Sequence, residues 1–216
     1  MTRRAGKRFA FLKRQSYART AGTLSKRMHF GKGISAQTAG RRWMEVKIVM
    51  GTILAIDPGN TESGYVVVEH DGEEIRRVLE AGKIENPAVT DMLDRKLYAN
   101  CIDVAIEMIA GMGMTVGQEV FDTCVWIGRF WEIALRSGGY EPKRIYRREE
   151  KLNLCGCLSA KDKNIRQALI DRYGVVGTKK DPGFFYVNGT KFAKDMWAAM
   201  AVAVTYFDKY IKGVKL

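Results

Sequence analysis

The fold is decided by one stretch of the chain, Thr52-Ile53-Leu54-Ala55-Ile56-Asp57-Pro58-Gly59-Asn60-Thr61-Glu62-Ser63-Gly64-Tyr65-Val66-Val67-Val68. An apolar segment ends on one aspartate, and a Pro-Gly turn leads into a second apolar segment. A residue that precedes proline favours extended backbone, so Asp57 is expected to end a strand. Gly59 lets a ligand approach the main chain closely, and Gly64 restarts the sheet after a short turn. The stretch alone is typical of an ordinary hairpin, whereas further carboxylates at matching positions would indicate a metal site.

The segments that follow predict a mixed α/β fold with five strands. Residues 53–57 and 65–69 form the first two, and the Asp71-Gly72 turn leads to a third strand through Ile75, Val78 and Leu79. These three form an antiparallel meander. Short apolar segments at residues 104–109 and 143–147 predict the fourth and fifth strands.

Helices are predicted between and after these strands. Thr90 is expected to cap a helix that carries Met92, Leu97, Tyr98 and Cys101, and apolar residues from Val120 to Leu135 recur at helical spacing up to Gly138-Gly139. Ser159 and Asp162 resemble a capping box for a helix that stops at Gly174. Residues 175–190 are expected to form an irregular loop that touches substrate, before a last helix over residues 194–211.

The positive charge is concentrated in the first 49 residues. The 216-residue chain has a net charge of +12, and residues 1–49 hold 13 of its 36 basic residues but only one of its 24 acidic residues. The other residues therefore carry 23 of each sign. We expect residues 1–49 to form a disordered basic arm and residues 50–216 to form the folded domain. The arm is interpreted as a nonspecific phosphate-binding tail, as an over-long start before Met50, or as an organelle transit peptide.

Cysteine usage and hydropathy indicate a cytoplasmic protein. Cys101, Cys124, Cys155 and Cys157 have neither a second CxxC motif nor nearby histidines to complete a zinc site, since His29 and His70 lie far away in sequence. We interpret them as small core residues in a reducing compartment. No apolar segment is long enough to cross a bilayer, and no secretory signal is visible, so no membrane partner is expected.

Three carboxylates lie at matching positions. Asp57 ends the first strand, Glu107 lies late in the fourth, and Asp195 opens the last helix, where the helix dipole alone would favour an acid. Glu107 is the anomaly, because a glutamate inside an apolar strand is costly to bury unless it is paired or bound to metal. If the first and fourth strands are adjacent, Asp57 faces Glu107. Clustered oxygen ligands suit Mg²⁺ or Mn²⁺ rather than zinc.

Four motifs in this order resemble the RuvC family of Holliday-junction resolvases, in the RNase H-like superfamily, and especially its phage-type members. The resemblance spans residues 51–211. It rests on Ile56-Asp57-Pro58-Gly59 with Gly64, on Ala105-Ile106-Glu107, on Ala160-Lys161-Asp162-Lys163-Asn164-Ile165-Arg166, and on Asp195-Met196-Trp197-Ala198-Ala199. The family implies an α/β RNase H-like fold, with a five-stranded mixed sheet flanked by helices.

The resemblance also implies a nuclease that uses two Mg²⁺ or Mn²⁺ ions to cut four-way DNA junctions as a homodimer. Asp57, Glu107 and Asp195 would be the catalytic metal ligands, with Asp57 bridging both ions. Lys163, or else Lys161, would bind the phosphate near the cut, although a solvated helix start explains both lysines equally. Nucleic-acid contacts are expected from Lys161, Lys163, Arg166, Lys179 and Lys180.

The chain departs from the family pattern in two places, and other readings remain open. Lys191 and Phe192 occupy positions where many relatives have a fourth acid or a histidine, so water is a candidate fourth ligand. A Met-rich stretch, residues 110–114, stands where an aromatic wedge often follows the second acid in relatives, so either this stretch does the wedging or junction selectivity is weaker. A branched-DNA endonuclease of broader selectivity fits equally well. The alternatives are an RNase H-like nuclease of ribosomal RNA precursors and a DNA-binding protein without activity. An actin-like kinase is excluded, because such kinases need two domains of this kind and the folded part of this chain is too short for two.

Overall fold

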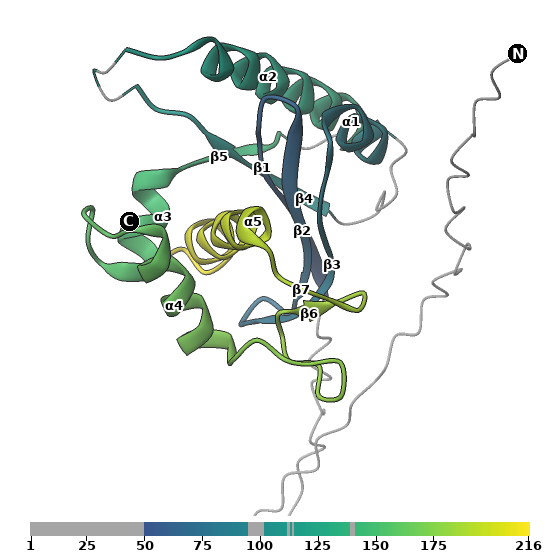
Figure 1. Ribbon diagram of the computed structural model, residues 1–216, viewed down its shortest axis with the longest axis vertical. Helices are drawn as coiled ribbons and strands as arrows, with labels where there is room; N and C mark the ends of the chain where they lie inside the picture. Colours follow the sequence, from purple (N-terminus) through teal and green to yellow (C-terminus); the bar gives the residue numbers. More distant parts are fainter. Residues whose placement is uncertain (1–49, 95–101, 112, 114, 139–140) are drawn as a thin grey trace, which may run out of the picture. The chain divides into compact units, whose positions relative to one another are not determined.

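The computed structural model describes residues 50–94, 102–111, 113, 115–138 and 141–216 (Figure 1). The predicted arm at residues 1–49 lies outside the described residues. So do Leu97, Tyr98 and Cys101 of the first predicted helix, and Met112 and Met114 of the Met-rich stretch. The domain boundary near residue 50 therefore stays a prediction.

A five-stranded mixed sheet forms the centre of the domain, as the sequence predicted. Its strand order is β3-β2-β1-β4-β5. The first three strands are an antiparallel meander, while β4 runs parallel to β1 and β5 runs parallel to β4. The strands are β1 (Gly51–Asp57), β2 (Glu62–His70), β3 (Ile75–Glu85), β4 (Ile102–Met108) and β5 (Lys143–Tyr146).

Helices cover both faces of this sheet (Figure 1). On one face lie α1 (Asn86–Asp94) and α2 (Gln118–Gly138). On the other lies α5 (Lys194–Tyr206), which continues into a π-helical turn, η1 (Phe207–Ile211), and is flanked by α3 (Arg147–Cys155) and α4 (Asp162–Tyr173). A small hairpin of β6 (Tyr186–Val187) and β7 (Thr190–Lys191) precedes α5 within the segment predicted to be an irregular loop.

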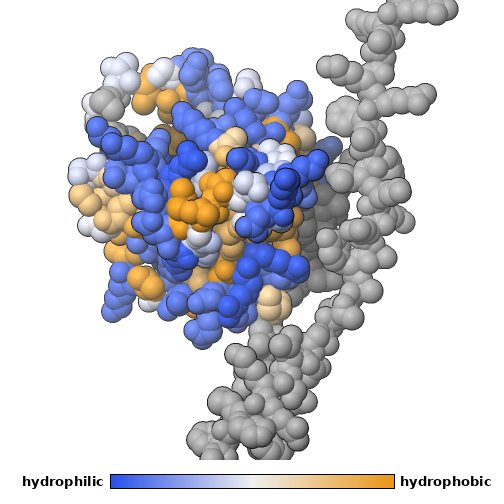
Figure 2. All heavy atoms as spheres, turned by 60° about the horizontal axis from the view of Figure 1, so that its bottom comes forward, coloured by the Kyte–Doolittle hydropathy of each residue, from blue (hydrophilic) through white to orange (hydrophobic). Residues whose placement is uncertain are grey.

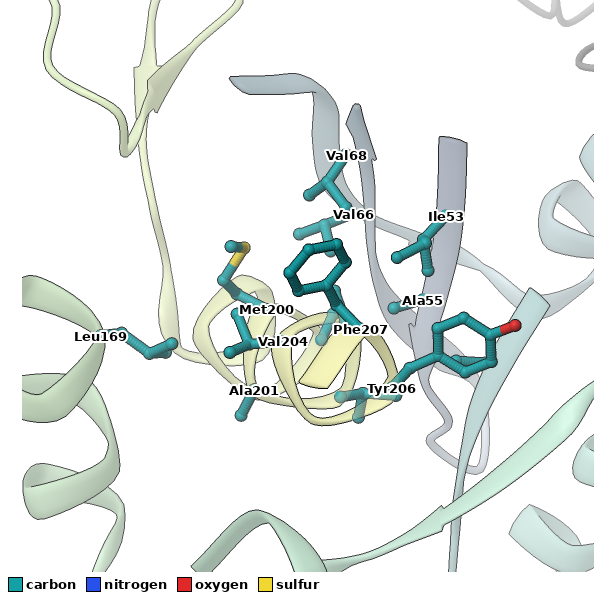
Figure 3. Close-up of a cluster of buried hydrophobic side chains, with 14 of the residues drawn as sticks. Ile53, Ala55, Val66, Val68, Leu169, Met200, Ala201, Val204, Tyr206 and Phe207 are labelled. Carbon is teal, nitrogen blue, oxygen red and sulfur yellow. The ribbon is translucent and has the colours of Figure 1, made fainter. Parts of the chain in front are cut away.

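Alternating side chains of the central strands supply two separate cores. Ile53 and Ala55 of β1 pack with α5, whereas Leu54 and Ile56 point to the opposite face and pack with α1 and α2. Figure 3 shows side chains from β1 and β2 directed at Met200, Val204 and Phe207. Because α5 lies against the sheet and beneath α3 and α4, all of its residues from Ala199 to Tyr206 are buried, which explains why the helix is apolar on every side.

Two predicted helix starts are wrong. The first helix begins at Asn86 instead of following a Thr90 cap, and the Thr90 hydroxyl donates to the Pro87 carbonyl oxygen inside the helix. Pro87 suits a first helical turn, where its missing N–H costs nothing. The Ser159 cap is also wrong, because α4 begins after Lys161, whose main-chain N–H donates to Asn164 Oδ1 at 3.0 Å.

The sequence analysis missed α3 altogether. Arg147 was expected to end the fifth strand, but it is the first residue of this helix. Residues 147–155 are mostly polar and give no apolar period. Their one helical signal is Glu149, whose carboxylate accepts a hydrogen bond from the Tyr146 main-chain N–H at 2.8 Å.

On the face shown in Figure 2, hydrophilic side chains surround smaller hydrophobic patches. Cys124 and Cys155 are partly buried, but Cys157 is exposed, which contradicts its predicted core role. Its loop connects α3 to α4 and leaves the thiol against the Ser159 hydroxyl. Within the described ranges, no helix combines the length and the apolar character needed to cross a membrane.

Candidate active site

Asp57 and Glu107 meet at the carboxyl ends of two adjacent strands. The parallel register of β1 and β4 pairs Ile56 with Ile106, so the next residue on each strand carries the acid. The first and fourth strands are therefore adjacent, which is the condition under which Asp57 was expected to face Glu107. Burial, and then the neighbouring Glu107, raise the pKa of Asp57 to about 8. Burial, and then Glu150, raise the pKa of Glu107 to about 7.

Asp195 reaches the same place from the first turn of α5. Its negative charge also raises the pKa of Asp57, so the two carboxylates are close enough to interact. The Asp195 carboxylate forms an ion pair with Lys83 Nζ at 3.2 Å, and Lys83 also pairs with Glu62 at 3.3 Å. All three predicted acids line one pocket of about 640 Å³, although they come from segments far apart in sequence.

Two further charged residues of this site, both in α3, were missed by the sequence analysis. Glu150 is 0 % exposed, and Arg147 forms ion pairs with Glu150 and with Asp162 of α4. Burial raises the pKa of Glu150 to about 7, and the charge of Asp57 adds to this rise. The signal that could have found them is the Arg-x-x-Glu spacing directly after a strand, which places both residues on one side of a helix.

The predicted basic residues divide into two groups. Lys163 and Arg166 line the pocket, and the Arg166 guanidinium stacks 4.8 Å from the centre of the Trp197 ring. Lys194 lines it too, although it was not predicted.

The other predicted nucleic-acid contacts lie away from the pocket lining. Lys161 precedes α4, and Lys179 and Lys180 lie in the loop that follows this helix. All three are exposed, and none of them is among the residues that line the pocket. Of the two lysines predicted to bind phosphate, only Lys163 lines the pocket.

A metal site fits the chemistry of these residues but needs side-chain movement. Among the described residues, no three His, Cys, Asp or Glu side chains form a group that could hold an ion as they stand. Even so, the donors are carboxylate oxygens, which hard divalent cations prefer. Burial raises the pKa values of Asp57 and Glu107, and the negative charges of Glu107 and of Glu150, respectively, raise them further. A bound cation would offset these negative charges. Asp195 would have to turn from Lys83 to join them.

Neither residue at the position of the relatives' fourth acid can serve as a ligand. Phe192 is buried and packs against Phe185 and Trp197, while Lys191 is exposed on β7. In the Met-rich stretch, the described residues Ala110, Gly111 and Gly113 are exposed.

Comparisons with solved structures identify the fold. RuvC from Thermus thermophilus matches with a TM-score of 0.55 and 16 % sequence identity, over 75 % of this chain and 96 % of that chain. The T. thermophilus RuvC structure in complex with Holliday junction substrate matches with a TM-score of 0.58 and 18 % identity, over 76 % and 96 % of the two chains. Searches of protein-family models and of curated proteins found no match. These matches confirm the predicted RuvC-like fold. At these sequence identities, they show the fold alone.

Proposed function

We propose that this chain is a metal-dependent endonuclease that resolves four-way DNA junctions. One observation carries the proposal: three carboxylates, Asp57, Glu107 and Asp195, line a single pocket in a domain with the fold of RuvC. A protein that only binds DNA would gain nothing from clustered acids that repel one another and the phosphate backbone. The same acids would serve a nuclease by holding cations.

The residues of the pocket have distinct proposed roles. Asp57, Glu107 and Asp195 would hold two Mg²⁺ or Mn²⁺ ions, with Asp57 shared between them. When bound, the ions would supply charge stabilisation for the attacking and leaving oxygens of phosphodiester hydrolysis. Lys163, which lines the same pocket, would bind the phosphate, and Arg166, held against Trp197, would contact the adjacent backbone.

The proposal includes a homodimer, because a four-way junction offers two equivalent strands to be cut. Among the aromatic residues of α2, Phe130 is fully buried in the core, and Trp126 and Trp131 are partly buried. Among the described residues of α2, the most exposed large apolar side chains are instead those of Phe121 and Val125, each 55 % exposed. We assign the dimer contact to Phe121 and Val125. We also propose that the protein is cytoplasmic.

The deciding experiment incubates the full chain with a labelled four-way junction, a linear duplex and a structured RNA. Each substrate is tested with Mg²⁺ and with EDTA, and the variant Asp57→Asn is tested beside the wild type. We expect Mg²⁺-dependent cutting of the junction by the wild type alone. Cutting that persists in EDTA or in the variant would refute the mechanism. RNA-only cutting would favour a nuclease of RNA precursors, and junction binding without cutting would favour a DNA-binding protein.

A further inference from the structure

Arg147 is held between carboxylates of two different helices. Its Nη1 donates to Glu150 Oε2 in a short contact, and its Nη2 donates to Asp162 Oδ1 at 2.6 Å. Arg147 and Asp162 are the first residues of α3 and α4. The guanidinium therefore joins the two helices at their N-terminal ends, with its orientation fixed from both sides.

This guanidinium faces the acids of the active site. It lines the same pocket as Asp57 and Glu107, and its positive charge acts to lower the pKa of both. Its side chain is 31 % exposed, so it can be reached from solvent. Guanidinium has five N–H donors in one plane, and its two ion pairs use only two of them. A planar donor set of this kind suits phosphate oxygens.

Stability alone does not account for the arrangement. Glu150 is fully buried, and its Oε1 has no hydrogen-bond partner among the described residues. A buried ion pair seldom stabilises a fold more than apolar side chains of the same volume would. The Asp162 side chain is 76 % exposed, so its pairing with Arg147 also adds little. A role in binding substrate through the remaining N–H groups of Arg147 would account for its placement.

We propose that Arg147 is a further catalytic residue, which binds a non-bridging oxygen of the phosphate to be cut, and that Glu150 is its positioning residue. The inference rests on the proposed nuclease function. Glu150 binds the Nη1 group of Arg147 in the protein interior, and the exposed Asp162 binds its Nη2 group. A phosphate of the substrate would replace Asp162 at Nη2. Phosphate oxygens would then be bound by Lys163 and Arg147 on the side facing the three acids.

The first test is a binding measurement that does not depend on cleavage. Full chains carrying Asp57→Asn are titrated with a four-way junction in EDTA at several salt concentrations. Adding Arg147→Gln should reduce the slope of log affinity against log salt by about 1, the loss of one phosphate contact. The matched control is Arg148→Gln, because Arg148 is the exposed next residue and lies outside the pocket lining. We expect it to leave the slope unchanged.

The second test measures cleavage at saturating junction with Asp57 intact. Arg147→Gln should slow cutting about 100-fold, as the loss of one transition-state donor does, while Arg148→Gln cuts at the wild-type rate. Arg147→Lys keeps the charge and guards against misfolding of the glutamine variant. Arg147→Lys should restore the wild-type salt slope, because it keeps the positive charge. Its cutting rate should stay below about a tenth of the wild-type rate, because an ammonium group cannot form the two parallel hydrogen bonds of a guanidinium.

The positioning role of Glu150 is tested by a double-mutant cycle. Glu150→Gln should slow cutting in the wild type but add nothing to Arg147→Gln. Wild-type slope and rate in a folded Arg147→Gln would overturn the phosphate contact, and additive losses would overturn the role of Glu150. A wild-type chain that neither binds nor cuts junctions would overturn the proposed function and this inference together. That result differs from the two outcomes above, in which the wild-type chain is active.

Discussion

Gly64 lies directly against Asp195. A Cβ atom built on Gly64 would stand 2.5 Å from the Asp195 main-chain oxygen and 2.9 Å from the Asp195 Cβ atom. Gly64 is also the partner of Asp57 in the register of β1 and β2. The missing side chain of one glycine therefore allows the start of α5 to approach the end of β1, and brings the third acid to the other two.

Replacing Gly64 by alanine should separate Asp195 from Asp57. The new methyl group meets main-chain atoms, which cannot turn away as a flexible side chain would. We expect the free energy of unfolding to fall by about 1–3 kcal/mol and junction cutting to slow by about 100-fold. Chemical denaturation and single-turnover cleavage measure the two effects.

The matched control is Gly128→Ala in α2, where an added Cβ has no atom within 4 Å. Alanine should raise the free energy of unfolding there by about 0.5–1 kcal/mol, because it favours a helix interior over glycine. Full activity in Gly64→Ala would show that the close approach is not needed for the site.

Without divalent cations, stability should fall as the pH rises. The pKa values of Asp57 and Glu107 are about 8 and about 7 in the folded protein, against ordinary values of 3.8 and 4.5. Between these limits the folded state binds more protons than the unfolded state, so the free energy of unfolding decreases from about pH 4 to about pH 8. Denaturation in EDTA across this range measures the slope. Asp57→Asn should flatten it, and an equal slope in the variant would contradict the assignment.

Magnesium should reverse the loss of stability at high pH. A cation bound to the ionised acids stabilises only the folded state, so the melting temperature at pH 8 should rise with Mg²⁺ concentration. A concentration 100 times the dissociation constant would add about 2.7 kcal/mol. The rise should be absent from Glu107→Gln, which keeps the size of the side chain but removes its charge. Equal rises in both proteins would place the bound cation elsewhere.

Lys163 and Lys161 should differ in their effect on cutting. Lys163 lines the pocket and Lys161 does not, although both are exposed and only two residues apart. Lys163→Ala should slow cutting about 100-fold at saturating DNA, because it removes a cation facing the transferred phosphate. Lys161→Ala should change the rate less than about 3-fold. The reverse order would assign the phosphate contact to Lys161.

The dimer contact on α2 is tested by placing a charge there. Val125 lines an apolar cavity of about 700 Å³ beside Trp126 and Ile133. Val125→Glu should raise the dimer dissociation constant at least about 10-fold, equal to about 1.4 kcal/mol, because it would bury an unpaired charge. Analytical ultracentrifugation measures this change. Val175→Glu, at a 75 % exposed position after α4, should have no effect. A wild-type protein that stays monomeric on junction DNA would refute the dimer.

The sequence predicted the strands well because their hydropathy patterns are local. Ile53 to Ile56 and Tyr65 to Val68 are apolar throughout, as strands covered by helices on both faces must be. The sequence failed where local and tertiary preferences differ. Thr90 and Ser159 have side chains that often cap helices, but neither caps one here. Pro87 lies in the first turn of α1, and the Asn164 side chain accepts a hydrogen bond from the main chain just before α4.

The sequence by itself determined the three-strand meander, the two further strands and the three acids, because the type and position of these residues follow from local patterns. Only the tertiary structure decided which charges meet. Arg147 and Glu150 belong to a polar helix without an apolar period, and β5 brings that helix beside Glu107. The approach of Asp195 to Asp57 depends on a glycine 131 residues before the aspartate. Contacts between distant segments arise from packing, and no local pattern encodes them.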